Sequence, residues 1–328
     1  MLFRYAVIPY KRGLCMNEDG IRQLVDEGHA QVRRGNTSLA LRCWDVVIAL
    51  REQTRPNPSQ DPTGYADWLA QQGSDPIGVY QAQAGLLYTT GRYEEAEPLY
   101  REALAMRQQA LPLGHPDIAT SLNNLAALLK ATGRYEEAEP LYREALAMRQ
   151  QALPLGHPDI ATSLNNLALL LYTTGRYEEA EPLYREALAM WQQALPVGHP
   201  DIATSLNNLA ALLKATGRYE EAEPLYREAL SMRQQALPVG HPDIVNSLRN
   251  LALLLEATGR YRDAEPLRRE VLAVSRMKQL VAGHSEDVVQ NLNDLADLIE
   301  RDGRPAEAEP FYREARDMQQ AATGKSVE

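Results

Sequence analysis

Histidines are the residues of this sequence whose type and repetition most readily suggest chemistry. Five of them follow a glycine at nearly constant intervals: His115, His157, His199, His241 and His284. Imidazole is a common zinc ligand, and each zinc ligand must lie about 2 Å from the metal. Helices that pack together are separated by about 8–10 Å, so one histidine in each layer of helices cannot reach a shared ion. Since four of the five precede proline and aspartate, we expect them to form turns and helix caps.

Glutamates form the second set that could do chemistry. Glu136, Glu137 and Glu139 recur in every clean copy of a repeated segment. General acid–base work needs carboxylates whose burial shifts their pKa, whereas these residues are expected on a solvated helix face. The sequence has no His-Glu-x-x-His, no paired Cys-x-x-Cys, no Gly-x-Ser-x-Gly and no Walker-type phosphate loop. We therefore expect neither catalysis nor a cofactor.

The histidines and glutamates recur because the chain repeats itself. One 42-residue unit is written three times without a gap over Ala119–Ile244. A period of this size indicates an array in which each unit buries its apolar face against its neighbours. Apolar residues at three- and four-residue spacing predict one helix over about 117–132 and a second over about 135–153, separated by Gly133. Pro140 predicts either a late start or a slight kink of the second helix.

The unit resembles the tetratricopeptide repeat (TPR). It is similar to the long version of this repeat found in kinesin light chains in the segments NNLA, GRYEEAEPLYREAL and HPD. The match runs through Leu122, Leu125, Ala126, Leu129, Gly133, Tyr135, Ala138, Tyr142 and Ala145. The usual unit has roughly 34 residues, and the additional ones here fall in MRQQALPLGHP. The resemblance implies an all-α, right-handed α-solenoid of about seven antiparallel helix pairs, a TPR superhelix, that binds other proteins.

The register of the repeat also predicts the organisation of the chain. We expect an N-terminal segment over 1–20, a degenerate TPR-like helix pair over 21–55, a linker over 56–76 with a short helix around 64–72, six TPR repeats over 77–320 and a tail over 321–328. In the degenerate pair, Gly28 and Trp44 stand where the clean unit has Ala126 and Tyr142, and Glu27 replaces a core leucine.

Composition excludes several classes of partner. The 328 residues carry a net charge of −10, whereas nucleic acid or an anionic membrane surface would need a clustered basic face.

The apolar stretch Tyr5–Tyr10 is shorter than a secretory core, and far shorter than a membrane span of roughly 20 residues. We expect a cytoplasmic protein with no membrane insertion, in which Cys15 and Cys43 are reduced.

The first helix of each pair is expected to line a concave groove, and its non-core residues are the candidate ligand surface. Paired asparagines recur there although asparagine is a mediocre helix former, and each amide offers a donor and an acceptor to a peptide backbone. The residue three before each glycine changes from copy to copy: Tyr88, Lys130, Tyr172, Lys214 and Glu256. Leu169 and Leu253 replace alanine and offer apolar contacts.

The predicted peptide-binding residues are Asn123, Asn124, Lys130, Asn165, Asn166, Leu169, Tyr172, Asn207, Asn208, Lys214, Arg249, Asn250 and Leu253. In kinesin light chains, asparagines at the matching place hold peptide backbones, so the resemblance implies this role for the asparagines of the set. The alternative is that they bond to adjacent repeats.

We therefore expect a non-enzymatic scaffold that binds an extended, partly acidic peptide segment with an aromatic or apolar anchor. Two alternatives stay open. One is self-association through the open ends of the array. The other is a sensor or regulatory subunit of a bacterial multi-protein signalling or defence system.

Overall fold

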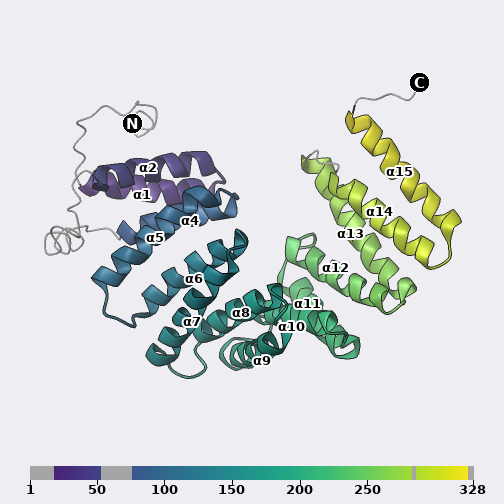
Figure 1. Ribbon diagram of the computed structural model, residues 1–328. Coiled ribbons are helices and arrows are strands. Elements are labelled where there is room, and N and C mark those ends of the chain that lie inside the picture. Colours follow the sequence, from purple (N-terminus) through teal and green to yellow (C-terminus); the bar gives the residue numbers. More distant parts are fainter. Residues whose placement is uncertain (1–17, 53–75, 283–285, 324–328) are drawn as a thin grey trace. The chain divides into compact units, whose positions relative to one another are not determined.

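The described part of the chain is built of helices and contains no strand. The structure, a computed structural model, describes residues 18–52, 76–282 and 286–323. Its helices are α1 (Glu18–Arg33), α2 (Thr37–Glu52), α4 (Pro76–Thr89), α5 (Tyr93–Ala110), α6 (Pro116–Ala131), α7 (Tyr135–Ala152), α8 (Pro158–Thr173), α9 (Tyr177–Ala194), α10 (Pro200–Ala215), α11 (Tyr219–Ala236), α12 (Pro242–Ala257), α13 (Tyr261–Ala282), α14 (Glu286–Arg301) and α15 (Pro305–Thr323) (Figure 1). The predictions for Cys15, for the helix around 64–72 and for His284 lie outside these ranges.

The helices form two compact units, Met1–Leu155 and Gly156–Glu328. In the first unit, α1 packs on α2, α4 on α5 and α6 on α7, and the α2–α4 and α5–α6 contacts join successive pairs. In the second unit, α8 to α15 pair in the same way, and α9–α10, α11–α12 and α13–α14 contacts join the pairs. Short turns make the two helices of a pair antiparallel. The predicted all-α array of helix pairs is thus confirmed for the described residues.

Histidine caps explain where the first helix of four pairs begins. The Nδ1 atoms of His115, His157, His199 and His241 accept hydrogen bonds from the backbone N–H two residues later, at 3.1, 3.1, 3.2 and 3.2 Å. The proline between donor and acceptor occupies the first helical turn, where its missing N–H costs nothing. The predicted turn-and-cap role is confirmed for these four histidines.

Glycine and proline define the second helix of each pair. Gly133 has a φ of +76°, and the N–H of the following residue donates to the Leu129 carbonyl at 2.8 Å, which closes the first helix. The second helix, α7, already contains Pro140 in its interior, so the late helix start considered for this proline is wrong. Proline has no N–H to donate to the carbonyl of Glu136, and Glu136 is an exposed residue that water can reach.

Small and large side chains alternate in the core of each pair. Ala126 in α6 and Ala138 and Ala145 in α7 have no exposed surface, which allows close approach of the two helices. Tyr142 is 1% exposed and fills the space between them. These residues belong to the predicted apolar stripes.

The first pair, α1 and α2, keeps this architecture through a compensating exchange. Trp44 replaces the repeated tyrosine, and a Cβ atom added at Gly28 would lie 2.3 Å from the indole Nε1. Glycine is therefore required opposite the larger ring. Glu27, which replaces a core leucine, is only half-buried and accepts a hydrogen bond from Gln31, so no unpaired charge enters the core.

Arginine–glutamate pairs tie the second helices of neighbouring pairs together. Glu223 in α11 bonds to Arg227 of the same helix at 2.7 Å and to Arg260, which precedes α13, at 2.6 Å. Burial raises the pKa of Glu223, but the two arginine bonds outweigh it and lower the pKa below its ordinary value. Glu139 occupies the same position of its own repeat as Glu223, and it too is half-buried and bonded to an arginine. The solvated face expected for Glu139 is therefore not what the structure shows.

Candidate binding surface

The predicted ligand-binding residues lie on the first helices of the pairs. Asn123, Asn124 and Lys130 lie on α6 in the first unit. The other ten lie on α8, α10 and α12 of the second unit, where α10 contacts both α8 and α12. We call the shared side of α8, α10 and α12 that carries these ten residues the first-helix face.

Asparagines form bonds from one repeat to the next on this face. Asn208 Nδ2 donates to Asn165 Oδ1 at 3.0 Å, and Asn250 Nδ2 donates to Asn207 Oδ1 at 2.9 Å. The second asparagine of one first helix thus donates to the first asparagine of the preceding first helix. This is the alternative role considered for the asparagines, and it fixes the orientation of the amides on α10 and α12.

The expected exposure of the first asparagines is wrong at two positions. Asn123 is 5% exposed, and Asn165 is 8% exposed. Asn123 donates to the Ala119 carbonyl at 3.2 Å within its own helix. The reason at Asn165 is that its side chain points toward the neighbouring first helix, α10, where Asn208 meets it. By contrast, Asn208 and Asn250 are only half-buried.

The position three residues before each glycine alternates between tyrosine and lysine before it becomes Glu256. Lys214 is half-buried; burial lowers its pKa, and nearby Glu256 partly opposes this effect. Burial likewise lowers the pKa of Lys130. Tyr172 packs on Tyr177 of its own pair, with ring centroids 5.5 Å apart.

The apolar candidates differ in exposure. Leu253 on α12 is 40% exposed, whereas Leu169 on α8 is half-buried. Of the two leucines, Leu253 therefore offers the larger area to a ligand.

A buried charge cluster next to Lys214 was not foreseen from the sequence. Arg268 in α13 stands where other copies have the core tyrosine, and its side chain is 8% exposed. Its Nε donates to Glu256 at 2.8 Å and its Nη1 donates to Asp294 of α14 at 2.9 Å. A buried arginine is tolerated only with such partners. The signal in the sequence was the joint change of tyrosine to Arg268 and of lysine to Glu256.

A second arginine position, also missed, links first helices to second helices. Arg233 in α11 donates to Ser247 Oγ of α12 at 2.7 Å and to Thr204 Oγ1 of α10 at 3.3 Å. One repeat earlier, Trp191 replaces this arginine, and both its Nε1 and the Ser205 hydroxyl are buried with no hydrogen-bond partner among the described residues. The buried serine of the next first helix thus has its hydrogen bond where the preceding second helix carries Arg233 and lacks it where that helix carries Trp191.

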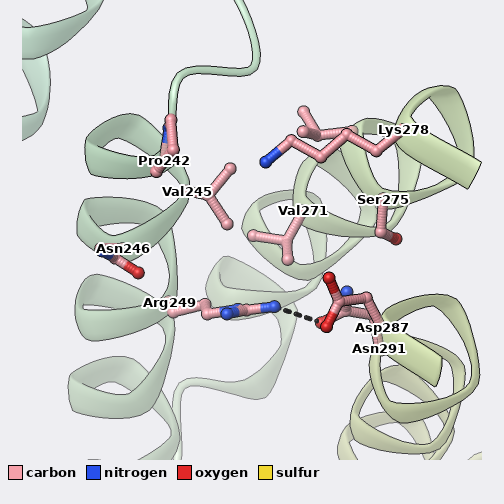
Figure 2. Close-up of a pocket in the computed structure, with 10 residues that line it drawn as sticks. Pro242, Val245, Asn246, Arg249, Val271, Ser275, Lys278, Asp287 and Asn291 are labelled. Carbon is pink, nitrogen blue, oxygen red and sulfur yellow. Dashed lines mark hydrogen bonds between the residues drawn. The ribbon is translucent and has the colours of Figure 1, made fainter. Parts of the chain in front are cut away.

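One repeat later, Ser275 replaces the same arginine and a cavity of about 100 Å³ lies beside it. Figure 2 shows this cavity between α12, α13 and α14, with the guanidinium of Arg249 directed at Asn291. Arg249 Nη2 donates to Asn291 Oδ1 at 3.1 Å. The lining residues are Pro242, Val245, Asn246, Arg249, Val271, Val274, Ser275, Lys278, Asp287 and Asn291. Of the predicted peptide-binding residues, only Arg249 lines it.

Two further properties bear on the kind of site. Within 18–52, 76–282 and 286–323, no group of three or more histidine, cysteine or acidic side chains is arranged to hold a metal ion. None of the helices in those ranges is both long enough and apolar enough to cross a bilayer.

Comparison with solved structures gives relatives of the same architecture. The nearly identical TPR-like repeats of a Podosopora anserina protein assigned as a kinesin light chain are 25% identical, with a TM-score of 0.57 over 64% of this chain and 99% of that chain. BtubC (BKLC) from P. vanneervenii is 23% identical, with a TM-score of 0.54 over 80% of this chain and 93% of that one. A Rap protein complexed with Competence and Sporulation Factor is 13% identical, with a TM-score of 0.55 over 94% of this chain and 99% of that one.

The sequence itself matches a family model. No curated protein matches the chain. The model of the tetratricopeptide repeat matches residues 79–151, 159–235, 201–277 and 243–321, which together cover well over half of the sequence. The resemblance to tetratricopeptide repeats, including those of the kinesin light chain type, is therefore confirmed. This chain belongs to the tetratricopeptide repeat family.

Proposed function

We propose that this chain is a non-enzymatic scaffold whose first-helix face binds an extended peptide segment of a partner protein. Tetratricopeptide repeat proteins generally mediate protein–protein interactions and are generally not enzymes. One observation carries the finer proposal: Asn208 and Asn250, one repeat apart, each donate through Nδ2 to the preceding repeat and are as residues only half-buried, which leaves the side-chain carbonyl oxygen of each as an acceptor. These oxygens can accept hydrogen bonds from peptide N–H groups.

The bonds between asparagines support this role rather than oppose it. Because Asn165 and Asn207 hold the amides of Asn208 and Asn250, the accepting oxygens are already oriented before a ligand arrives. Orientation in advance lowers the entropy lost on binding, which is about 0.5–1.5 kcal/mol for a mobile side chain. Asn124 in the first unit and Asn166 in the second are likewise half-buried, and each would serve in the same way within its own unit.

The remaining residues of the proposed site suggest the character of the ligand. Leu253 is 40% exposed and offers an apolar contact. Lys214 makes no ion pair within the described residues, and its charge would attract an acidic group. Tyr172 and Leu169 offer further apolar area for an aromatic or aliphatic anchor. A partly acidic peptide with one such anchor fits this set.

Selection from a displayed library of short unstructured peptides tests the proposal. The full chain should enrich a family of sequences, and a photoreactive group in the enriched peptide should cross-link to α8, α10 or α12. Lack of enrichment, or cross-links confined to the second helices, would contradict the proposal.

A second candidate, self-association or docking through the turns, is favoured by one observation. Each turn before a capping histidine carries an apolar residue that is almost fully exposed: Leu113 at 100%, Leu155 at 97%, Val197 at 100% and Val239 at 87%. Light scattering should show mass rising with concentration if copies associate through these residues, and changing all four to serine should abolish the rise.

We also propose a cytoplasmic location. Cys43 is a buried free thiol, which fits a reducing compartment.

A further inference from the structure

The cavity beside Ser275, which we call the Ser275 pocket, exists because one repeat departs from the others. In the preceding pair, Arg233 occupies the equivalent place and reaches across to Ser247. Ser275 is too short to do so, and its hydroxyl instead donates to the Leu272 carbonyl at 2.8 Å in its own helix. The residue equivalent to Ser247 has also changed, to Asn291. The two exchanges remove an arginine and leave about 100 Å³ of space.

Three hydrogen-bond donors line this space, from Arg249, Lys278 and Asn291. Asn291 is 2% exposed, and its Nδ2 group is buried with no hydrogen-bond partner among the described residues. Because Arg249 donates to Asn291 Oδ1, the amide must turn its oxygen to Arg249, which leaves Nδ2 as the unused donor. Lys278 extends over the same pocket in Figure 2 and makes no ion pair in the described part of the chain.

The balance of charge and the size of the pocket restrict the ligand. Two cations, Arg249 and Lys278, face one acid, Asp287, at the start of α14. The surplus of one positive charge matches a monoanion better than a dianion. A volume of about 100 Å³ is several times the roughly 10–15 Å³ of probe-occupied space that one water molecule needs, which leaves room for a carboxylate on a short aliphatic stem. Val245, Val271 and Val274 provide the apolar wall for such a stem.

We infer that the Ser275 pocket binds the side-chain carboxylate of a glutamate or aspartate in the partner peptide. Asn291 Nδ2 and the two cations donate to the carboxylate, and the valines contact its methylene groups. This inference rests on the proposed function, since it assumes that a peptide lies along the first-helix face. It names Asn291, Ser275 and Lys278 as residues that select an acidic side chain, and it places that side chain beside Arg249.

The test uses small probes that report on the pocket without the rest of a peptide. The full chain, labelled with nitrogen-15 on asparagine, is titrated with N-acetyl-glutamate N-methylamide, whose only charge is its side-chain carboxylate. The expected result is a saturable shift of the Asn291 side-chain amide signal. N-acetyl-glutamine N-methylamide is the neutral control, and N-acetylglycine offers only a terminal carboxylate. An equal response to the glutamine probe, tighter binding of N-acetylglycine, or no response to the glutamate probe would overturn the inference.

The chain itself provides a variant that fills the pocket. Ser275→Arg with Asn291→Ser recreates the Arg233–Ser247 contact of the preceding pair, so this double variant should fold with the pocket occupied. Since it lacks Asn291, isothermal titration calorimetry follows the probe, and binding should disappear. Lys278→Gln alone should weaken the glutamate probe roughly two- to fivefold, because Lys278 is an exposed residue and the loss of one exposed ion pair has a small effect. Unchanged affinity in the double variant would overturn the inference.

The two proposals fail in different ways. If library selection enriches peptides whose affinity is the same in the double variant, the Ser275 pocket is not part of the site but peptide binding stands. If the glutamate probe binds the pocket while no peptide is enriched, the peptide-binding proposal fails.

Discussion

Ser247 and Ser205 provide a matched comparison within one chain. Both serines are 0% exposed and occupy the same position of successive repeats. Ser247 accepts from the Arg233 guanidinium at 2.7 Å, whereas Ser205 faces a repeat in which Trp191 stands in place of arginine and has no hydrogen-bond partner among the described residues. The same substitution, serine to alanine, should therefore have opposite effects at the two sites.

The expected magnitudes follow from these contacts. Ser247→Ala removes a hydrogen bond to a charged donor, worth about 1.5–3 kcal/mol net. Ser205→Ala removes a buried hydroxyl whose desolvation is not offset, so it should be neutral or stabilise by up to about 1–2 kcal/mol. The gain in helix propensity from serine to alanine is common to both variants and cancels in their difference. We expect Ser205→Ala to be the more stable variant by about 2–4 kcal/mol.

Urea denaturation followed by far-ultraviolet circular dichroism measures the difference. Hydrogen exchange of the α10 and α12 amides gives a local check, because repeat arrays can unfold in parts. Combining Arg233→Met with Ser247→Ala completes a double-mutant cycle, in which a coupling energy of at least about 1 kcal/mol is expected. Equal stabilities of the two serine variants, or no coupling in the cycle, would refute the role assigned to the arginine.

Three further predictions concern the fold. The folded-state pKa of Glu223 is lowered mainly by its arginine bonds, against the opposing effect of burial; its contribution to stability is therefore present above the ordinary value of 4.5 and lost as pH falls through the folded-state pKa. Urea midpoints should accordingly fall with acidification more steeply in the parent than in Glu223→Gln, and parallel curves would contradict the pairing. Gly28→Ala should destabilise the first pair by about 1–3 kcal/mol, because the added Cβ meets the Trp44 ring; an unchanged thermal midpoint would count against that contact. Deletion of 161–202, one whole repeat, should leave a folded protein whose helicity per residue is preserved, and a collapse of the helical spectrum would reject the repeat boundaries.

Sequence alone predicted the helices and their caps because each copy repeats the same signals. The 42-residue period, the glycine at the turn and the proline after histidine fix both ends of the first helix in every clean repeat. The predicted range of about 117–132 compares with Pro116–Ala131 in the structure. The prediction for Pro140 was incomplete, since sequence could not show that an exposed first turn tolerates the missing N–H bond.

The sequence predicted the binding surface less well than the helices. Asn165 and Asn166 are adjacent, yet one is buried against α10 and the other is half-buried, because helix packing distinguishes positions that differ by about 100° around the axis. The division into segments beginning at 1, 21, 56, 77 and 321 stays a prediction. Arg268 and Ser275 were missed because the pattern drew attention to what the copies share, whereas these two sites arise where one copy differs.

Direct titration of the peptide enriched by library selection tests the central claim, that the first-helix face is a peptide-binding site. Asn250→Ala should weaken binding about two- to tenfold, as expected for one lost hydrogen bond, while its urea midpoint shows whether the fold is kept. Lys214→Glu should weaken an acidic peptide most strongly at low salt. Glu178→Ala, an exposed change on the second helix α9, is the control and should bind like the parent. Loss of affinity in the first two variants alone is the predicted result; unchanged affinity in both, or a loss confined to Glu178→Ala, would contradict the account.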